Sequence, residues 1–218
     1  DYTDQSLRQM TPLEKFSIPR REKVETRDMQ FGGALGGPII PDVMHFFVTY
    51  EGKRIERPIQ ITPGFGLPAT FFPEEYQDVF GSTNSTFNED LYFGKISVLP
   101  ASGHLIEVSG KYRDESGDFL GSGSNSRSTL SFQNVKEFRG LLRYEYSADN
   151  FINEFKATYE DVKWAPTPAE FGNSLQFNYA APSATDPTVS SGASNILRVG
   201  GGSNYQDKGQ KGIGLQDD

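Results

Sequence analysis

The sequence contains no cysteine, so this chain can form neither a disulfide bond nor a thiolate metal site. It has only two histidines, His45 and His104, and neither has a partner at metal-ligand spacing, so no metal site is predicted. No run of about 18 apolar residues occurs, which excludes a transmembrane helix. The formal net charge is −8 and no basic stripe is present, which argues against nucleic acid as a partner.

No pattern in the sequence predicts catalysis or a cofactor. The glycine-serine run at 121–124 is not followed by the Lys-Ser/Thr pair of a phosphate-binding loop. The acidic residues Asp114, Glu115 and Asp118 could present oxygens to Ca²⁺, but they lack the EF-hand pattern, and a solvated loop is the simpler interpretation. No Ser/His/Asp set is convincing. We therefore expect a protein that is not an enzyme and holds no cofactor.

What the sequence does contain is alternation. Three segments switch between apolar and polar residues on both sides of a short turn, which is the pattern of a β-hairpin. They cover residues 29–51, 90–113 and 137–160. The predicted fold class is all-β, an antiparallel meander of long hairpins.

The connections between these hairpins are unequal in length. Tight turns are predicted near Pro41, Ser102 and Ala148, whereas Pro-, Gly- and Ser-rich excursions cover residues 55–87, 114–136 and 163–210. Long structureless connections are unusual in a compact soluble domain. Short turns at one end and long loops at the other are typical of outer-membrane barrels, whose weakly apolar strands escape a hydropathy test.

The strands are predicted to be about 9–11 residues long, which is the length of a tilted membrane-spanning strand. Interfacial rings are expected near their ends, because Tyr and Trp bury a ring and keep a polar tip in water. The aromatic residues expected towards the long loops are Tyr50, Tyr112, Tyr159 and Trp164, and those expected towards the tight turns are Tyr146 and Phe151.

The alternation also predicts two faces. A Lys or Arg at the lipid midplane costs about 2–4 kcal/mol, so charged positions should face a wet lumen and apolar positions should face lipid. The residues predicted to face lipid are Phe46, Val48, Tyr50, Ile106, Val108, Tyr112, Leu142, Tyr144, Phe155 and Tyr159. Those predicted to face the lumen are Glu107, Lys111, Arg139, Arg143, Glu154 and Lys156.

The amino-acid sequence of the predicted strands resembles that of a known family. GGALGGPI at 32–39 and HFFVTYEGKR at 45–54 look like early barrel strands of TonB-dependent outer-membrane receptors. The subgroup they resemble is the Oar-like one, which carries a carboxypeptidase-regulatory-like domain ahead of the plug. Four further segments look like successive parts of the same receptors: NEDLYFGKIS, HLIEVSGKYRDESG, LLRYEYSADNFINEFKATYEDVKWAP and DKGQKGIGLQDD.

The resemblance implies a barrel of about 22 strands filled by a plug. Six strands cannot close a barrel, since roughly eight is the minimum. We therefore expect residues 1–218 to be a partial outer-membrane barrel domain that lacks the plug, with a further strand starting at 211–218. The implied function is uptake of a large substrate, not identified by the sequence, across the outer membrane of a Gram-negative bacterium.

The resemblance also implies the partners: outer-membrane lipid, the protein's own plug and remaining strands, and the TonB complex through an N-terminal part absent from this chain. One alternative stays open. A soluble or surface-exposed β-sandwich that binds carbohydrate or a protein partner would alternate in the same way. The two differ in the apolar face, which a sandwich covers with a second sheet and a barrel wall leaves bare.

Overall fold

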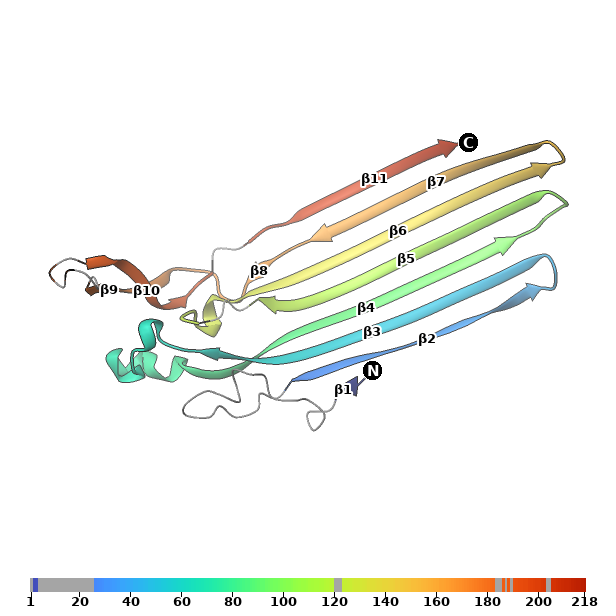
Figure 1. Cartoon of the computed structure of the whole chain (residues 1–218). Helices are drawn as coiled ribbons and strands as arrows, with labels where there is room; N and C mark the ends of the chain where they lie inside the picture. The colour runs from blue at the N-terminus through green and yellow to red at the C-terminus, as the bar shows by residue number, and fades with distance from the viewer. Residues whose placement is uncertain are drawn as a thin grey trace.

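A computed structural model describes residues 2–3, 26–119, 123–182, 186, 188, 190–202 and 205–218. In these ranges the chain is built from long strands, short strands and short 3₁₀ helices (Figure 1). The long strands are β2 (Arg27–Ile40), β3 (Met44–Ile61), β4 (Gly81–Val98), β5 (His104–Phe119), β6 (Ser131–Ala148), β7 (Phe151–Trp164) and β11 (Lys208–Asp217). The others are β1 (Tyr2–Thr3), β8 (Thr167–Pro168), β9 (Ser174–Pro182) and β10 (Ser190–Gly200), with η2 (Gly64–Gly66), η3 (Ala69–Phe71), η4 (Glu74–Val79) and η5 (Arg127–Thr129).

The main sheet is an antiparallel meander, as the alternation predicts. In the described residues its strand order is β1-β2-β3-β4-β5-β6-β7-β11, and β8 pairs with β6. From β1 to β7 strands that are neighbours in sequence are neighbours in space, β11 then adds beside β7, and the sheet stays open (Figure 1). The predicted all-β meander of long hairpins is thus confirmed.

The three tight turns lie together at one end of this sheet (Figure 1). They occupy residues 41–43, 99–103 and 149–150. Gly103 adopts φ +78° in the second turn, and a Cβ there would lie 2.3 Å from the Ser147 carbonyl oxygen. Only glycine combines that dihedral angle with that close approach.

The strands are longer than the predicted 9–11 residues, since β2 to β7 each contain 14 to 18. The predicted hairpin ends at Glu51, and the Pro- and Gly-rich residues 55–87, which include Pro58, are predicted to be an excursion, whereas β3 continues to Ile61. The ladder between β2 and β3 ends at Glu56, so at Pro58 the strand β3 is paired on one side only, with β4. Proline is tolerated at such an edge position because no ladder bond is required on the unpaired side. Likewise, Asp114, Glu115 and Asp118 lie in β5 and not in a loop.

The C-terminal segment forms the expected further strand. β11 pairs with β7 from Lys208↔Trp164 to Asp217↔Phe155, which starts three residues before the predicted position. At the other end, the mixed, charged sequence of residues 1–28, with Pro12 and Pro19, predicts an extended loop, and most of it lies outside the described residues. β1 pairs with β2 there through Tyr2↔Met29.

The long connections are not independent loops. Their described parts, residues 62–80, 123–130, 165–182 and 190–202, pack together at the end of the sheet opposite the tight turns, and we call this unit the cap (Figure 1). β9 and β10 form a hairpin, and the amide of Ser126 donates to the carbonyl of Arg198 at 2.8 Å. The Thr62 amide donates to the Gly123 carbonyl at 2.9 Å, which ties the cap to the end of β3.

The apolar core of the described residues lies in the cap. Phe72, Ile196 and Leu197 are buried together. A register shift between Asn195 and Leu197 inserts an extra residue in β10, so two consecutive side chains can turn to the same side. Gly64 packs directly on this bulge, because a Cβ there would lie 2.8 Å from the Cα of Ile196.

In the parts of the chain that the structure describes, no helix is long and apolar enough to cross a membrane.

Candidate functional surfaces of the sheet and the cap

The two faces of the main sheet follow from the strand register, because directly paired residues of neighbouring strands point to the same side. Val108 of β5 pairs with Ile96 of β4 and Leu142 of β6. Leu142 pairs in turn with Ala157 of β7, which pairs with Leu215 of β11. The next residues along the strands alternate to the opposite face.

One face carries a surface that we call the apolar band. It consists of Phe31, Gly33, Leu35, Gly37, Phe46, Val48, Tyr50, Tyr92, Gly94, Ile96, Val98, His104, Ile106, Val108, Gly110, Tyr112, Phe138, Gly140, Leu142, Tyr144, Tyr146, Phe155, Ala157, Tyr159, Ile213 and Leu215. None of these positions is Asp, Glu, Lys or Arg, and the charged residue next to them on this face at the turn end is Asp217, the last residue of β11, which pairs with Phe155. Val108, near its centre, is nevertheless 52% exposed. The band is therefore a broad apolar surface that the described part of the chain leaves open.

The apolar band ends towards the cap in a row of aromatic rings. Neighbouring rings touch across the strands: Phe31 and Tyr50 at 6.0 Å, Tyr50 and Tyr92 at 5.0 Å, and Tyr92 and Tyr112 at 6.2 Å between centroids. Phe138 and Tyr159 continue the row at 6.1 Å. Rings at this boundary bury an apolar body and keep a polar tip available.

Charged residues begin directly beyond the ring row on the same face. The Tyr50 hydroxyl donates to Asp90 at 2.6 Å, and the guanidinium of Arg54 forms two bonds to the same carboxylate. The hydrogen bond from Tyr50, followed by those from Arg54, holds the pKa of Asp90 below its ordinary value. Lys136 and Lys211 pair similarly with Asp114 and Asp161.

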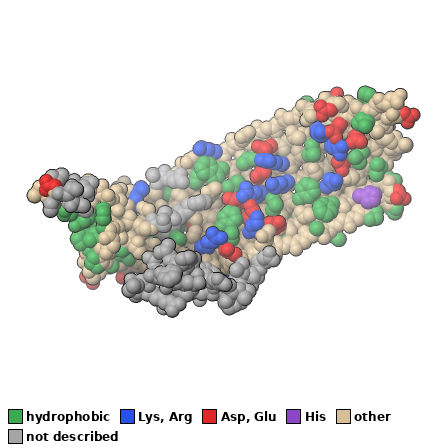
Figure 2. Space-filling model, in the orientation of Figure 1, with side chains coloured by type: hydrophobic (Ala, Val, Ile, Leu, Met, Phe, Trp, Pro, Cys, Tyr) green, Lys and Arg blue, Asp and Glu red, His purple; other side chains and the backbone are tan. Residues whose placement is uncertain are grey.

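The opposite face is charged, and Figure 2 shows acidic and basic side chains gathered over this side of the sheet. Near the cap, Arg113 lies between two carboxylates that are directly opposed across β4 and β5, Glu89 and Glu115. Lys53 contacts Glu89 from β3 at 3.0 Å. Without these cations two opposed and buried carboxylates would repel each other.

Glu89 is only 8% exposed, and its burial opposes ionisation. The hydrogen bonds from Lys53 and Arg113 outweigh burial and hold the pKa of Glu89 below its ordinary value. The group therefore remains a carboxylate that links three strands.

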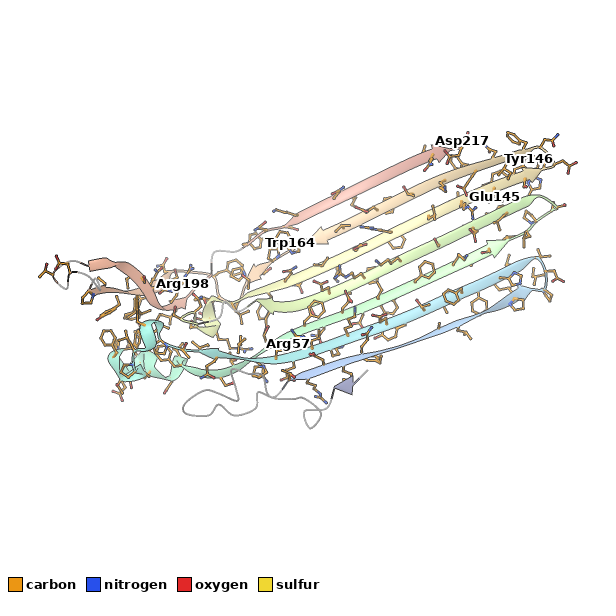
Figure 3. All side chains as sticks on the ribbon, in the orientation of Figure 1. Arg57, Glu145, Tyr146, Trp164, Arg198 and Asp217 are labelled. Atoms are coloured by element: carbon orange, nitrogen blue, oxygen red, sulfur yellow. The ribbon has the colours of Figure 1, made fainter. Side chains whose placement is uncertain are left out.

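A second charge network lies on the same face nearer the tight turns. Lys95 of β4 contacts Glu107 of β5 at 2.9 Å, and Arg143 of β6 contacts Glu107 at 2.9 Å. Arg143 also pairs with Glu154 of β7, which pairs with Lys156. This network joins four adjacent strands, and Figure 3 marks the neighbouring Glu145 at this end of β6.

The structure places all ten residues predicted to face lipid on the side of the apolar band, and all six predicted to face the lumen on the charged side. It brings Glu107, Arg143, Glu154 and Lys156 into one network, whereas Lys111 and Arg139 reach Glu137 closer to the cap. Which face meets lipid stays a prediction.

One predicted boundary ring lies at the expected end of its strand but on the other face. Trp164 lies at the cap end of β7 (Figure 3), but it pairs with Val135 on the charged face. The ammonium of Lys208 lies 5.0 Å from its ring centroid. Trp164 lies an odd number of residues after Tyr159 in the same strand. Because side chains alternate between the two faces, the two rings point to opposite sides and Trp164 cannot belong to the ring row.

The cap carries a surface that sequence reasoning missed, because its residues were assigned to loops. Phe65 and Phe71 both pack edge-on against Tyr179, at 5.7 and 6.0 Å between centroids. We call these three residues the aromatic shelf. The alternation in Gln176–Tyr179 could have revealed the strand that positions Tyr179.

Within the described ranges, no cluster of three or more His, Cys, Asp or Glu side chains has the geometry of a metal site. Asp114 and Glu115, which sequence analysis considered for Ca²⁺, point to opposite faces of β5. The chain matches no protein-family model, no curated protein and no solved structure to which it was compared.

Proposed function

We propose that this chain is part of the wall of an outer-membrane β-barrel, and that the barrel belongs to a TonB-dependent transporter for large substrates. The observation that carries the proposal is the apolar band, which holds no Asp, Glu, Lys or Arg across seven strands and yet is exposed. An uncovered apolar surface of this breadth marks a partner or a membrane.

The dimensions of the band support lipid as that partner. On β6 it runs from Phe138 to Tyr146, eight steps along the strand, which at about 3.3 Å per residue gives a length of roughly 26 Å. A strand tilt of about 40° reduces this to roughly 20 Å of depth, which fits within the ~25 Å apolar belt of outer-membrane barrels. The ring row and the charges beyond it fit the membrane boundary.

The sandwich alternative requires a second sheet over the apolar face. The second sheet in the described residues has two strands, β9 and β10, and it lies in the cap at the end of the main sheet (Figure 1). That arrangement leaves the band uncovered. The proposed barrel instead places lipid on the band, the plug and water on the charged face, and the cap at the outer mouth.

Lipid contact is testable because the chain has no native cysteine. The variants Val108→Cys and Ser109→Cys place a thiol on the apolar band and on the charged face at adjacent positions of β5. Each would be labelled with an environment-sensitive fluorophore in the longest protein that the gene encodes, reconstituted in vesicles. Lipids with a quenching group on the acyl chain should quench the label at 108 strongly and the label at 109 weakly.

Equal quenching at the two positions would refute the barrel wall. The transporter part of the proposal has a separate test in the gene that encodes this segment. The gene should contain a plug-coding region before the segment and further alternating strands after it. A gene that encodes no plug would refute the assignment to TonB-dependent transport and leave the barrel wall intact.

A further inference from the structure

The aromatic shelf is exposed in a way that packing does not explain. Phe65 is 57% exposed and Phe71 is 52% exposed, although both contact Tyr179. Both rings also belong to the cap, whose core buries the adjacent Phe72 to 3% exposure. Paired rings left in water at the end of a protein mark an interaction surface.

The backbone at Phe65 is strained in order to present its ring. Phe65 has φ +57° and ψ +16°, a left-handed conformation that is an outlier for a bulky residue. It lies between Gly64, which packs on the bulge of β10, and Gly66, which has φ +64°. A glycine at position 65 would adopt this conformation without strain. A strained aromatic residue kept at an exposed tip points to a function for its ring.

The surroundings of the shelf are acidic. The described cap contains the acidic residues Glu74, Glu75, Asp78 and Glu170, with Asp186 between β9 and β10, and two basic residues, Arg127 and Arg198. Arg127 donates to Thr83 and Asn84 at the cap end of β4, and Arg198 pairs with Gln176, whose neighbour Phe177 faces the core side of the hairpin. Glu74, Glu75 and Asp78 lie on η4 and are exposed. The side chain of Gln77 donates to the carbonyl of Phe72 at 2.9 Å and fixes η4 beside the shelf. Exposed rings bordered by carboxylates attract cations through both the ring faces and the charges.

We propose that the aromatic shelf and η4 bind a cationic, partly apolar peptide segment, as the first contact of the transported ligand with the protein. The inference deepens the proposed function and rests on it in placing the cap at the outer mouth of the barrel. Lysine or arginine side chains of the peptide would contact Glu74, Glu75 and Asp78, and its apolar side chains would pack on Phe65 and Phe71. An anionic ligand would be repelled. A neutral carbohydrate would donate hydrogen bonds to the carboxylates but would gain no salt-dependent charge attraction from them.

The test measures binding to the full-length protein in detergent micelles, so it does not depend on lipid burial of the band. The probe is a fluorescein-labelled peptide of alternating lysine and leucine, followed by fluorescence anisotropy. A version with glutamate in place of lysine is the charge control, and maltohexaose is the carbohydrate competitor. We expect the lysine peptide to bind, its affinity to fall as salt rises from about 0.05 to 0.5 M, and neither control to compete.

Two variants separate recognition from folding. Phe65→Gly removes the ring and the strain together, so it should weaken binding about tenfold or more while the cap keeps its resistance to protease. Phe71→Ala should weaken binding similarly. The matched control is Phe171→Ala, since Phe171 is also exposed in the cap but pairs with Tyr205. It should change the affinity less than about twofold.

Several results would overturn the inference. Binding of the glutamate peptide as tightly as the lysine peptide would exclude charge recognition. Competition by maltohexaose without salt dependence would assign the shelf to carbohydrate, and absence of binding by every probe would remove the site. Loss of protease resistance in Phe65→Gly together with lost binding would make Phe65 a structural residue. Quenching of the label at position 108 by lipid would meanwhile report on the barrel independently.

Discussion

Leu141 and Leu142 offer a matched test of which face meets lipid. They are the same residue type at adjacent positions of β6, but Leu142 pairs with Val108 and Ala157 in the apolar band. Leu141 pairs with Ser109 and Thr158 on the charged face. Changing either one to lysine adds the same ammonium group at the same depth. Only the side of the sheet differs.

The expected cost follows from the position of Leu142 in the band. It lies midway between Phe138 and Tyr146, so about 13 Å of strand separates it from either end at roughly 3.3 Å per residue. At a tilt of about 40° that is roughly 10 Å of depth, which places Leu142 near the midplane. Leu142→Lys should then cost about 2–4 kcal/mol of folding free energy. Leu141→Lys should cost less than about 1 kcal/mol, because water and carboxylates solvate its ammonium on the lumen side.

The assay is reversible urea unfolding of the full-length protein in lipid vesicles, followed by tryptophan fluorescence. Leu142→Met controls for loss of shape without charge and should cost less than about 1.5 kcal/mol. Equal costs for the two lysine variants, or a larger cost at position 141, would contradict the assignment of faces. Phe155 is midway along the segment Phe151–Asp161 and the sequence therefore predicts it near the bilayer centre. In the structure Phe155 pairs with Asp217 and lies close to the tight turn, so it is a poorer probe.

Three further outcomes are expected. Gly64→Ala forces a Cβ to within 2.8 Å of the Ile196 Cα, so it should destabilise the cap by about 1–3 kcal/mol, measured as faster hydrogen exchange at Ile196 and Leu197 with the exchange of β5 unchanged. Arg113→Met leaves Glu89 and Glu115 buried without their shared cation, so it should lower the free energy of unfolding in urea by about 3 kcal/mol or more. Adding Glu89→Gln to this variant should recover part of the loss. No recovery would mean that the two carboxylates do not repel each other. The folded pKa of Glu89 lies below its ordinary value, so the carboxylate stabilises the fold above its unfolded pKa of about 4.3, and this contribution is lost as pH falls through the folded pKa. Glu89→Gln should therefore make the free energy of unfolding fall less steeply as the pH is lowered. Equally steep losses in the wild-type protein and the variant would show that Glu89 is not the responsible group.

The main sheet could be predicted from the sequence because its strands alternate strictly. Period two in segments such as Phe138–Tyr146 fixes both the strand and its two faces, and a short turn fixes the neighbour. The strand ends could not be predicted. Beyond the ring row β4 is mostly polar on both faces, and β3 keeps only Ile55, Ile59 and Ile61 among charged residues and Pro58. The alternation of hydropathy therefore weakens while the backbone ladder continues to the Ile61↔Gly81 pair.

The cap could not be predicted for a different reason. Its core joins Phe72 to Ile196 and Leu197, which lie in connections far apart in the sequence. Such a core leaves no local period, and the bulge in β10 breaks the one that a strand would give. The left-handed backbone at Phe65 could not be predicted either, because phenylalanine does not favour that conformation and the neighbouring glycines do not require it.

The cap also has a place in the order of folding. Strands β2 to β7 pair with their immediate neighbours in sequence, so each hairpin can form as soon as its two strands are present. The core around Phe72 and Leu197 can form only after the third long connection is present. The contact closes the loop between residues 72 and 197, and closing so long a loop is slow unless the sheet has already brought its ends together. The cap is therefore expected to assemble last, and a destabilised cap should leave the assembled sheet beneath it with an open and protease-sensitive end.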